Sequence, residues 1–259
     1  MPELPEVETL FRQLRQVITS ERILDMRIYD EKLVLFPEII GCQVHEVRRS
    51  GKGVEIDLGK AVLRIHLRMS GRLFWQRPGD IMPRHTRFRI AFARGEIICI
   101  DPRRFATLTL HGGVTPVPPR SINLLQGMNV EEICRRAADR RLPVKALLLD
   151  QRFLPGMGNI YACEILFDAA VSPWRPAGEV TAAEWRCINA AMGRILKEAV
   201  LCRGTSISDW RDLFGRPGEY QRRLRVYGRE GKTCLRCPGR VARRKLAGRG
   251  TYYCPDCQR

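Results

Sequence analysis

Two closely spaced cysteine pairs near the C-terminal end constrain the fold of this chain more than any other feature. Cys234 and Cys237 form one C-x2-C pair, and Cys254 and Cys257 form the second, with sixteen residues between the two pairs. Four thiolates in this pattern predict a tetrahedral structural zinc site, which leaves no open position for catalysis. Two disulfides are the alternative, and a reducing compartment disfavours them. The intervening stretch predicts a β-hairpin, with Arg249 between two glycines near its tip.

Charge and composition narrow the class of protein. The 259 residues carry a formal net charge of +17, and 44% of them are hydrophobic, as in globular proteins with a core. Arginine spread along the chain favours a polyanionic partner, most often nucleic acid, over charge that serves solubility alone. No apolar run approaches the ~18 residues of a membrane span, and the acidic N-terminus lacks a signal-peptide pattern. We therefore expect a cytoplasmic protein whose remaining cysteines are buried thiols, namely Cys42, Cys99, Cys134, Cys163, Cys187 and Cys202.

The first half of the chain predicts one helix followed by antiparallel strands. Apolar residues repeat at helical spacing from Val7 to Ile18, and Pro5 suits a first helical turn. Alternating stretches between about residues 23 and 110 predict an antiparallel β-sandwich or barrel. The clearest of them is "TRFRIAF", where the apolar residues Phe88, Ile90 and Phe92 alternate with Arg87, Arg89 and Ala91.

The second half predicts helices. The Pro- and Gly-rich stretch "HGGVTPVPPRS", residues 111–121, is typical of an interdomain linker. Thr181 and Glu184 have capping-box spacing and open a long helix, and "DQRFLPGMGNIYACEILF" predicts two helices around a Pro-Gly-Met-Gly break. The predicted fold class is α+β, with an N-terminal helix and antiparallel β-sandwich domain (1–115), a helical domain with a helix–turn–helix arrangement (122–226) and a zinc finger (227–259).

The first residues, "MPELPEVETL", pose a chemical question. An initiator methionine followed by proline is usually trimmed, which leaves Pro2 with a free secondary amine. That amine is either an ordinary chain end or a nucleophile. Glu6 and Glu8 suit the positive end of a helix dipole, so we expect the amine to lie just before a helix.

Five motifs in order along the chain resemble the formamidopyrimidine-DNA glycosylase family, whose sister group is endonuclease VIII. They are "PELPEVE", "MSGR", "DPRRF", "GMGNIYACE" and "GRGTYYCPDCQ", and they extend from residue 2 to residue 258. The family comprises bifunctional base-excision repair enzymes, in which a glycosylase and an abasic-site lyase share one site. The resemblance therefore implies a bacterial-type, nucleoid-associated monomer that acts on double-stranded DNA containing oxidised bases or abasic sites. It also implies one structural Zn2+ and a helix–two-turn–helix motif in the helical domain (122–226).

The resemblance implies four catalytic residues. Pro2 attacks the sugar C1′ of a damaged nucleoside and forms an iminium, and Glu3 protonates the sugar oxygen as the base departs. Lys52, between two glycines, donates a proton in β-elimination and contacts phosphate. Arg249 binds phosphates beside the lesion and assists δ-elimination. Taken without the resemblance, Lys52 is a turn lysine and Arg249 a solvated loop charge.

The resemblance also assigns DNA contacts. An extruded base leaves a gap in the stack, which long or flat side chains can fill. Met69, Arg103 and Phe105 match these wedge positions, with Arg103 facing the orphaned cytosine, although Met69 and Phe105 could instead be core residues. Backbone contacts match three further positions, which are His85, Arg152 and Asn159.

A base pocket is the last implied element. Glu6 supports this pocket, and the stretch from Ser206 to Tyr220 matches the loop that closes over an oxidised purine. Two residues depart from the family pattern, because Ala106 replaces the usual glycine after "DPRRF" and Thr86 replaces a common aspartate. These departures leave the opposite-base preference open.

Three functions are consistent with these patterns. The first is a glycosylase/lyase that removes 8-oxoguanine and formamidopyrimidines, and the second is an endonuclease VIII-like glycosylase for oxidised pyrimidines. The third is a non-enzymatic zinc-ribbon DNA-binding protein, which explains the charge and the cysteines but not the Pro2-Glu3 pair. The opening "PELPEVE" and the full-length loop before Tyr220 favour the first.

Overall fold

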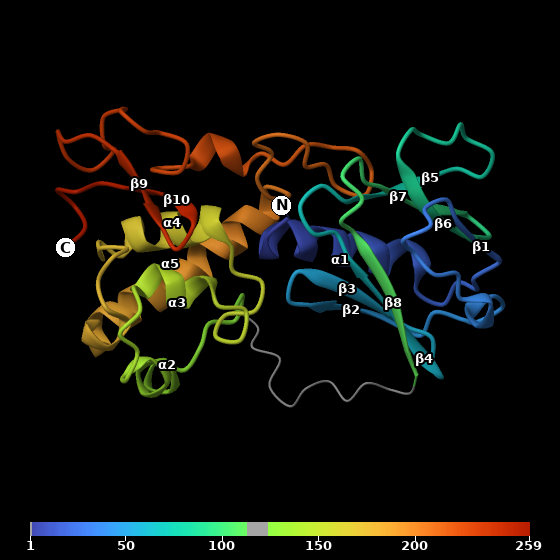
Figure 1. Cartoon of the computed structure of the whole chain (residues 1–259), viewed down its shortest axis with the longest axis horizontal. Helices are drawn as coiled ribbons and strands as arrows, with labels where there is room; N and C mark the ends of the chain where they lie inside the picture. The colour runs from blue at the N-terminus through green and yellow to red at the C-terminus, as the bar shows by residue number, and fades with distance from the viewer. Residues whose placement is uncertain (1, 113–123) are drawn as a thin grey trace. The chain divides into compact units, whose positions relative to one another are not determined.

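The chain was analysed as a computed structural model that describes residues 2–112 and 124–259 (Figure 1). It forms two compact units. Unit 1 comprises Met1–Ser121 and Cys202–Glu219, and unit 2 comprises Ile122–Leu201 and Tyr220–Arg259. The segment 202–219, which follows the longest helix in sequence, therefore belongs with the N-terminal residues.

Unit 1 begins with helix α1 (Leu4–Ile18), as the apolar spacing predicts. Leu4, Val7, Leu10, Leu14 and Ile18 are all buried, so one stripe of the helix faces the core. A proline in the first turn needs no hydrogen-bond partner there, because the first helical N–H groups have none within the helix.

Two four-stranded antiparallel sheets complete unit 1 and confirm the predicted sandwich. One sheet has the order β1 (Asp25–Ile28), β6 (Thr86–Phe92), β7 (Gly95–Ile100), β5 (Arg72–Gln76). The other has the order β2 (Glu46–Ser50), β3 (Gly53–Asp57), β4 (Ala61–His66), β8 (Thr107–Gly112). Buried side chains of both sheets and of α1 share one core, which also contains Trp210 and Leu213 from the returning segment. A short 3-10 turn, η1 (Pro37–Ile39), precedes β2.

The alternation predicted for β6 holds except at one position. Phe88, Ile90 and Phe92 are buried as expected, but Arg87 is only 2% exposed, whereas alternation predicts it on the polar face. The pairing of β6 with β7 shifts register between Thr86 and Phe88, so a bulge turns Arg87 inward. The bulge brings the guanidinium to two buried carboxylates, which makes its burial tolerable.

Unit 2 contains the predicted helices, α2 (Val130–Ala137), α3 (Val144–Leu149), α4 (Asn159–Asp168) and α5 (Ala182–Leu201), and the 3-10 turns η2 (Ala177–Glu179) and η3 (Tyr220–Arg223). The predicted capping box opens α5. Thr181 N donates to Glu184 Oε2 at 2.8 Å, and Glu184 N donates to Thr181 Oγ1 at 3.3 Å. Strands β9 (Ala242–Leu246) and β10 (Arg249–Tyr253) form the predicted C-terminal hairpin, and β10 packs on α4 (Figure 1).

The structure corrects the expectation of six buried cysteines and leaves most of the predicted linker untested. Most of the predicted linker, residues 113–121, lies outside the described residues, while His111 and Gly112 belong to β8. Of the six remaining cysteines only Cys99 and Cys163 are buried, and Cys187 is exposed because it lies on the outer face of α5. Within residues 2–112 and 124–259, no cysteine is in a disulfide and no helix is long and apolar enough to cross a membrane.

Candidate active site

Two carboxylates organise the N-terminal start of α1 in unit 1. Glu3 is the N-cap of the helix, and its backbone N–H donates to Glu6 Oε2 at 2.8 Å, while its side chain accepts from the Glu6 backbone. This reciprocal capping box places Pro2 immediately before the first helical turn. Glu3 and Glu6 are only 3% and 2% exposed, so both act in a largely dehydrated setting.

Glu6 also holds the returning segment of unit 1. Its Oε1 atom accepts a hydrogen bond from Thr205 N at 2.7 Å. Gly204 has a φ of +83°, and a Cβ there would lie 2.5 Å from Glu6 Oε1, so the close approach requires glycine. The carboxylate therefore joins the start of α1 to the beginning of the predicted pocket loop.

The two ends of the predicted pocket loop lie in different units. Ser206 Oγ, in unit 1, donates to Trp210 O at 2.7 Å and accepts from Gly218 N at 2.9 Å, which closes the loop on itself. Tyr220 belongs to unit 2, where it is 3% exposed and its ring packs against Tyr161 with centroids 5.8 Å apart. Burial raises the pKa of the Tyr220 phenol.

Lys52 lies in the two-residue turn that joins β2 to β3. Ser50 pairs with Gly53 across the turn, and Gly51 adopts a φ of +58°. Arg49, the next residue along β2, directs its Nε toward Glu8 Oε2 of α1 at 2.7 Å. The turn that carries Lys52 is therefore joined to the helix that carries Pro2 and Glu3.

His66 lies beside the Lys52 turn and was missed by sequence reasoning. It pairs with Gly53 in the sheet register, and its Nδ1 accepts from Arg68 N at 3.0 Å. Burial, followed by the charges of Arg68, Arg64 and Lys52, lowers the pKa of His66 to about 4, so the imidazole is neutral at physiological pH. Alternation in "AVLRIHL" places Arg64 and His66 on one face and could have drawn attention to them.

The three predicted wedge residues lie on two loops of unit 1 and are solvent-exposed. Met69, between β4 and β5, is 51% exposed, and Phe105, between β7 and β8, is 43% exposed. The Arg103 guanidinium lies over the Phe105 ring, 4.7 Å from its centroid. Large apolar side chains exposed this far are not core residues, which removes the structural alternative for both.

His85, immediately before β6, and Thr86, its first residue, hold the third predicted contact region. His85 is exposed and has a φ of +64°, which is uncommon for a residue other than glycine. Thr86 Oγ1 donates to Pro83 O at 2.7 Å, so the threonine that replaces the family's aspartate closes the local turn. The backbone of this turn is thereby fixed around His85.

In unit 2, Asn159 connects the start of α4 to the zinc hairpin. Its Oδ1 accepts from Lys145 Nζ at 2.6 Å, and its Nδ2 donates to Gly250 O at 2.9 Å. Lys145, which is fully buried, also donates to Thr251 Oγ1 at 2.8 Å. Arg249 is exposed and is the first residue of β10. The next residue, Gly250, is held by Asn159, so the backbone beside Arg249 is fixed to the start of α4.

Arg152 is exposed in the break between α3 and α4. It lines a small depression of about 210 Å³ with Arg136, Arg140, Leu147, Asp150 and Phe153. Arg136 donates to Arg152 O at 2.9 Å and lies over the Phe153 ring. Three guanidinium groups and one carboxylate leave the depression with a net positive charge, which suits a phosphate.

The four C-terminal cysteines meet at one point of unit 2. Their sulfur atoms all lie within 4.8 Å of one another, and the separations Cys234–Cys257 and Cys237–Cys254 are 3.8 and 3.5 Å. Zn–S bonds of about 2.3 Å in a tetrahedron require sulfur separations of ~3.8 Å, so the donor set fits one zinc ion. The protein therefore has a structural zinc centre, which supports the β9–β10 hairpin.

Three family models match the chain. The formamidopyrimidine-DNA glycosylase N-terminal domain matches residues 1–108, and the H2TH domain of the same enzymes matches residues 122–210. The zinc finger found in FPG and IleRS matches residues 231–259. Together these matches cover most of the sequence.

Curated relatives and solved structures are similar over the full length. Proteins named formamidopyrimidine-DNA glycosylase from Desulfitobacterium hafniense and Methylococcus capsulatus are each 36% identical, with complete coverage of both chains. A Lactococcus lactis FPG variant in complex with Fapy-dG-containing DNA is 28% identical, with a TM-score of 0.90 and complete coverage of both chains. The L. lactis Fpg in complex with abasic-site DNA is 29% identical, with a TM-score of 0.90 and 99% coverage of each.

Proposed function

Because the chain belongs to the formamidopyrimidine-DNA glycosylase family, we propose that it removes oxidised purines from duplex DNA and then cleaves the abasic strand. The substrates are 8-oxoguanine and formamidopyrimidines, and the covalent catalyst is the Pro2 amine. The observation that carries the proposal is the capping box of Glu3 and Glu6, two buried carboxylates at the start of α1, which Pro2 directly precedes in sequence.

The chemistry begins at the sugar C1′. The secondary amine of Pro2 attacks C1′, the glycosidic bond breaks, and the base leaves with its bonding electrons. Glu3 protonates the sugar oxygen, which opens the ring and yields an iminium between Pro2 and C1′. An α-amino group has an ordinary pKa of about 7.7–8.0, so an appreciable neutral fraction is available for attack near neutral pH.

Strand cleavage follows from the iminium. Its positive charge acidifies the C2′ hydrogen, and loss of that proton expels the 3′ phosphate in β-elimination. Lys52 donates a proton in this step, and a second elimination expels the 5′ phosphate with assistance from Arg249. The structure supports the role of Lys52 through the short ion pair that joins its turn to α1.

DNA recognition is the second part of the proposal. Met69, Arg103 and Phe105 fill the gap left by the extruded base, while His85, Arg152 and Asn159 contact the backbone. Glu6 and Ser206 shape the base pocket, and we infer that Tyr220 anchors the far end of its loop through Tyr161. The +17 charge favours such a complex. We further propose that the protein acts as a cytoplasmic, nucleoid-associated monomer.

Borohydride trapping tests this function. The full-length protein is reacted with a duplex containing 8-oxoguanine opposite cytosine, and the adduct is mapped by intact mass and N-terminal peptide mass. A covalent adduct on Pro2, without Met1, supports the proposal. An adduct obtained only with oxidised pyrimidines would place the protein with the endonuclease VIII group. Tight binding with no adduct on any lesion would make it a binding module.

A further inference from the structure

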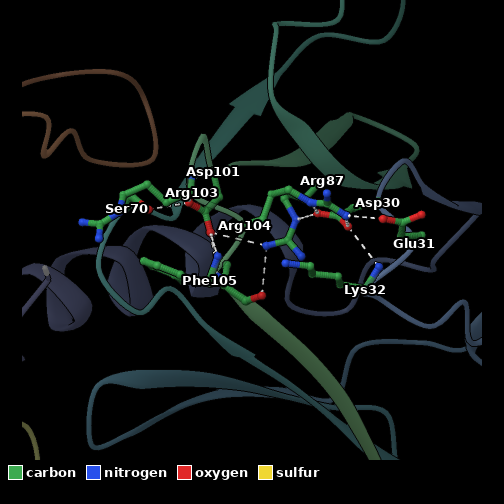
Figure 2. Close-up of polar contacts among 10 residues, drawn as sticks. Asp30, Glu31, Lys32, Ser70, Arg87, Asp101, Arg103, Arg104 and Phe105 are labelled. Atoms are coloured by element: carbon green, nitrogen blue, oxygen red, sulfur yellow. Dashed lines mark hydrogen bonds and ion pairs between the residues drawn. The ribbon is translucent and has the colours of Figure 1, made fainter.

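A fully buried carboxylate lies beneath the exposed wedge residues. Asp101, at the start of the loop from β7 to β8, is 0% exposed. Its Oδ1 accepts from Ser70 Oγ at 2.5 Å and from Arg103 N at 3.1 Å. Its Oδ2 accepts from Phe105 N at 2.7 Å and from Ala106 N at 2.6 Å (Figure 2).

These bonds join the two loops that carry the wedge. Ser70 follows Met69 directly, so its hydroxyl connects the Met69 turn to the Asp101 carboxylate. The other three donors are backbone N–H groups of the loop that presents Arg103 and Phe105. Hydrogen bonds to an ionised acceptor are about twice as strong as neutral ones, so the carboxylate fixes both loops.

The backbone of Asp101 reaches a third loop. Its N–H donates to His85 O at 3.0 Å, and His85 is the predicted backbone contact before β6. Arg87 supports the arrangement from beneath, since its Nη1 lies 3.4 Å from Asp101 Oδ2 and donates to Ala106 O at 3.1 Å. Arg87 also pairs with Asp30, which in turn binds Arg104 (Figure 2).

Ala106 adds an apolar contact between the same two loops. A Cβ added to Gly71, in the Met69 turn, would lie 3.0 Å from the Ala106 Cβ and 2.6 Å from Leu67 O. The Met69 turn therefore packs directly against the Ala106 methyl group, which is buried. This chain thus has one more contact between its wedge loops than a glycine at position 106 would provide.

We propose that Asp101 is a positioning residue that sets Met69, Arg103 and Phe105 in one fixed arrangement before DNA binds. The inference rests on the proposed function, because it assigns a reason for the arrangement rather than a new reaction. Loops that are already ordered lose less conformational entropy when they enter the base stack. Although burial raises the pKa of Asp101, hydrogen bonds from Ser70, Ala106, Phe105 and Arg103 lower it overall, so the carboxylate is ionised at neutral pH.

The test compares a substrate that needs a wedge with one that does not. In Asp101→Asn the side chain keeps its shape, but one acceptor oxygen is replaced by an NH2 group. In either orientation of the amide, this NH2 group faces hydrogen-bond donors and cannot accept from them. Single-turnover excision of 8-oxoguanine from a duplex should fall at least about tenfold, as expected for losing charged hydrogen bonds. Cleavage of a single-stranded abasic oligonucleotide, which has no stack to fill, should fall less than about threefold.

Two further variants keep the test decisive. Ser70→Ala removes only the hydrogen bond between the loops, and we expect a loss of about threefold to tenfold on the duplex alone. Asp80→Asn is the matched control, because Asp80 is an exposed aspartate that accepts from Arg77 N in its own turn, and both rates should be unchanged. If Asp101→Asn does not fold, Ser70→Ala decides.

The inference is overturned if Ser70→Ala and the soluble Asp101→Asn leave the duplex rate unchanged or lower both rates equally. Failure of the proposed function would give a different result. The wild-type protein would then neither cleave the single-stranded abasic oligonucleotide nor form a borohydride adduct. If the wild-type protein does both, but the variants show no larger loss on the duplex than on the single-stranded oligonucleotide, only the role of Asp101 is refuted.

Discussion

Glu8 has two arginine partners of very different exposure, and their comparison tests how the Lys52 turn is held. Arg49 Nε lies 2.7 Å from Glu8 Oε2, and the two side chains are 10% and 8% exposed. Arg12 Nε lies 2.9 Å from Glu8 Oε1, but the Arg12 side chain is 54% exposed. The same carboxylate therefore forms one buried and one solvated ion pair.

The expected free-energy costs differ accordingly. Removing one partner of a buried pair typically costs about 3–5 kcal/mol. Because Glu8 retains Arg12, we expect Arg49→Gln to lower the free energy of unfolding by about 2–3 kcal/mol. The Arg12→Gln substitution removes an exposed helical pair and should cost no more than about 0.5 kcal/mol.

The functional readout separates positioning from chemistry. In Arg49→Gln the hairpin that carries Lys52 loses its buried ion pair to α1, so the single-turnover rate of β-elimination on a preformed abasic duplex should fall about tenfold. Borohydride trapping on Pro2 precedes elimination and should be nearly unchanged, and Arg12→Gln should match wild type in both assays. Urea unfolding gives the stability, and quenched-flow sampling gives the rates.

Two results would refute this reasoning. Equal destabilisation by Arg49→Gln and Arg12→Gln would show that burial does not distinguish the pairs. A parallel fall of trapping and elimination in Arg49→Gln would show that the ion pair acts on the whole site rather than on the Lys52 turn.

Two other predictions concern the zinc centre and pH. Chelation of the zinc should unfold the β9–β10 hairpin, which carries Arg249. If Arg249 assists δ-elimination as proposed, the δ-elimination product should decrease more than the β-elimination product on gels. Arg104 donates to Asp30, and despite partial desolvation these contacts lower the pKa of Asp30 from 3.8 to about 2. This difference corresponds to about 2 kcal/mol of stability that is complete above pH ~4 and lost as the pH falls toward 2. Asp30→Asn should therefore flatten the acid limb of a stability curve; an unchanged limb would contradict the assignment.

The sequence predicts the elements whose signals are local. Helix α1, the capping box at Thr181 and the cysteine hairpin follow from spacing and residue type alone. The predicted exposure of Arg87 is wrong because a bulge turns its side chain inward. No local pattern predicts this bulge, since the partners that stabilise the buried guanidinium, Asp30 and Asp101, lie far away in sequence.

The candidate site shows the same limit. Motif matches located Pro2, Lys52 and Phe105, but they gave no account of what holds these residues in place. Asp101 lies within a quoted motif and Arg49 lies three residues before Lys52, but their partners become visible only in three dimensions. The positions of chemical groups could be predicted from sequence, whereas their supports depend on contacts between distant segments.

The discontinuity of unit 1 has a consequence for synthesis on the ribosome. Trp210 and Leu213 complete the core of the N-terminal sandwich, and Trp75 N donates to Leu213 O at 2.8 Å. Gln13 of α1 likewise binds Asp212 and Leu213. The nascent sandwich therefore remains without part of its core until residues 202–219 have been translated, so unit 1 cannot be completed before most of unit 2 has been synthesised.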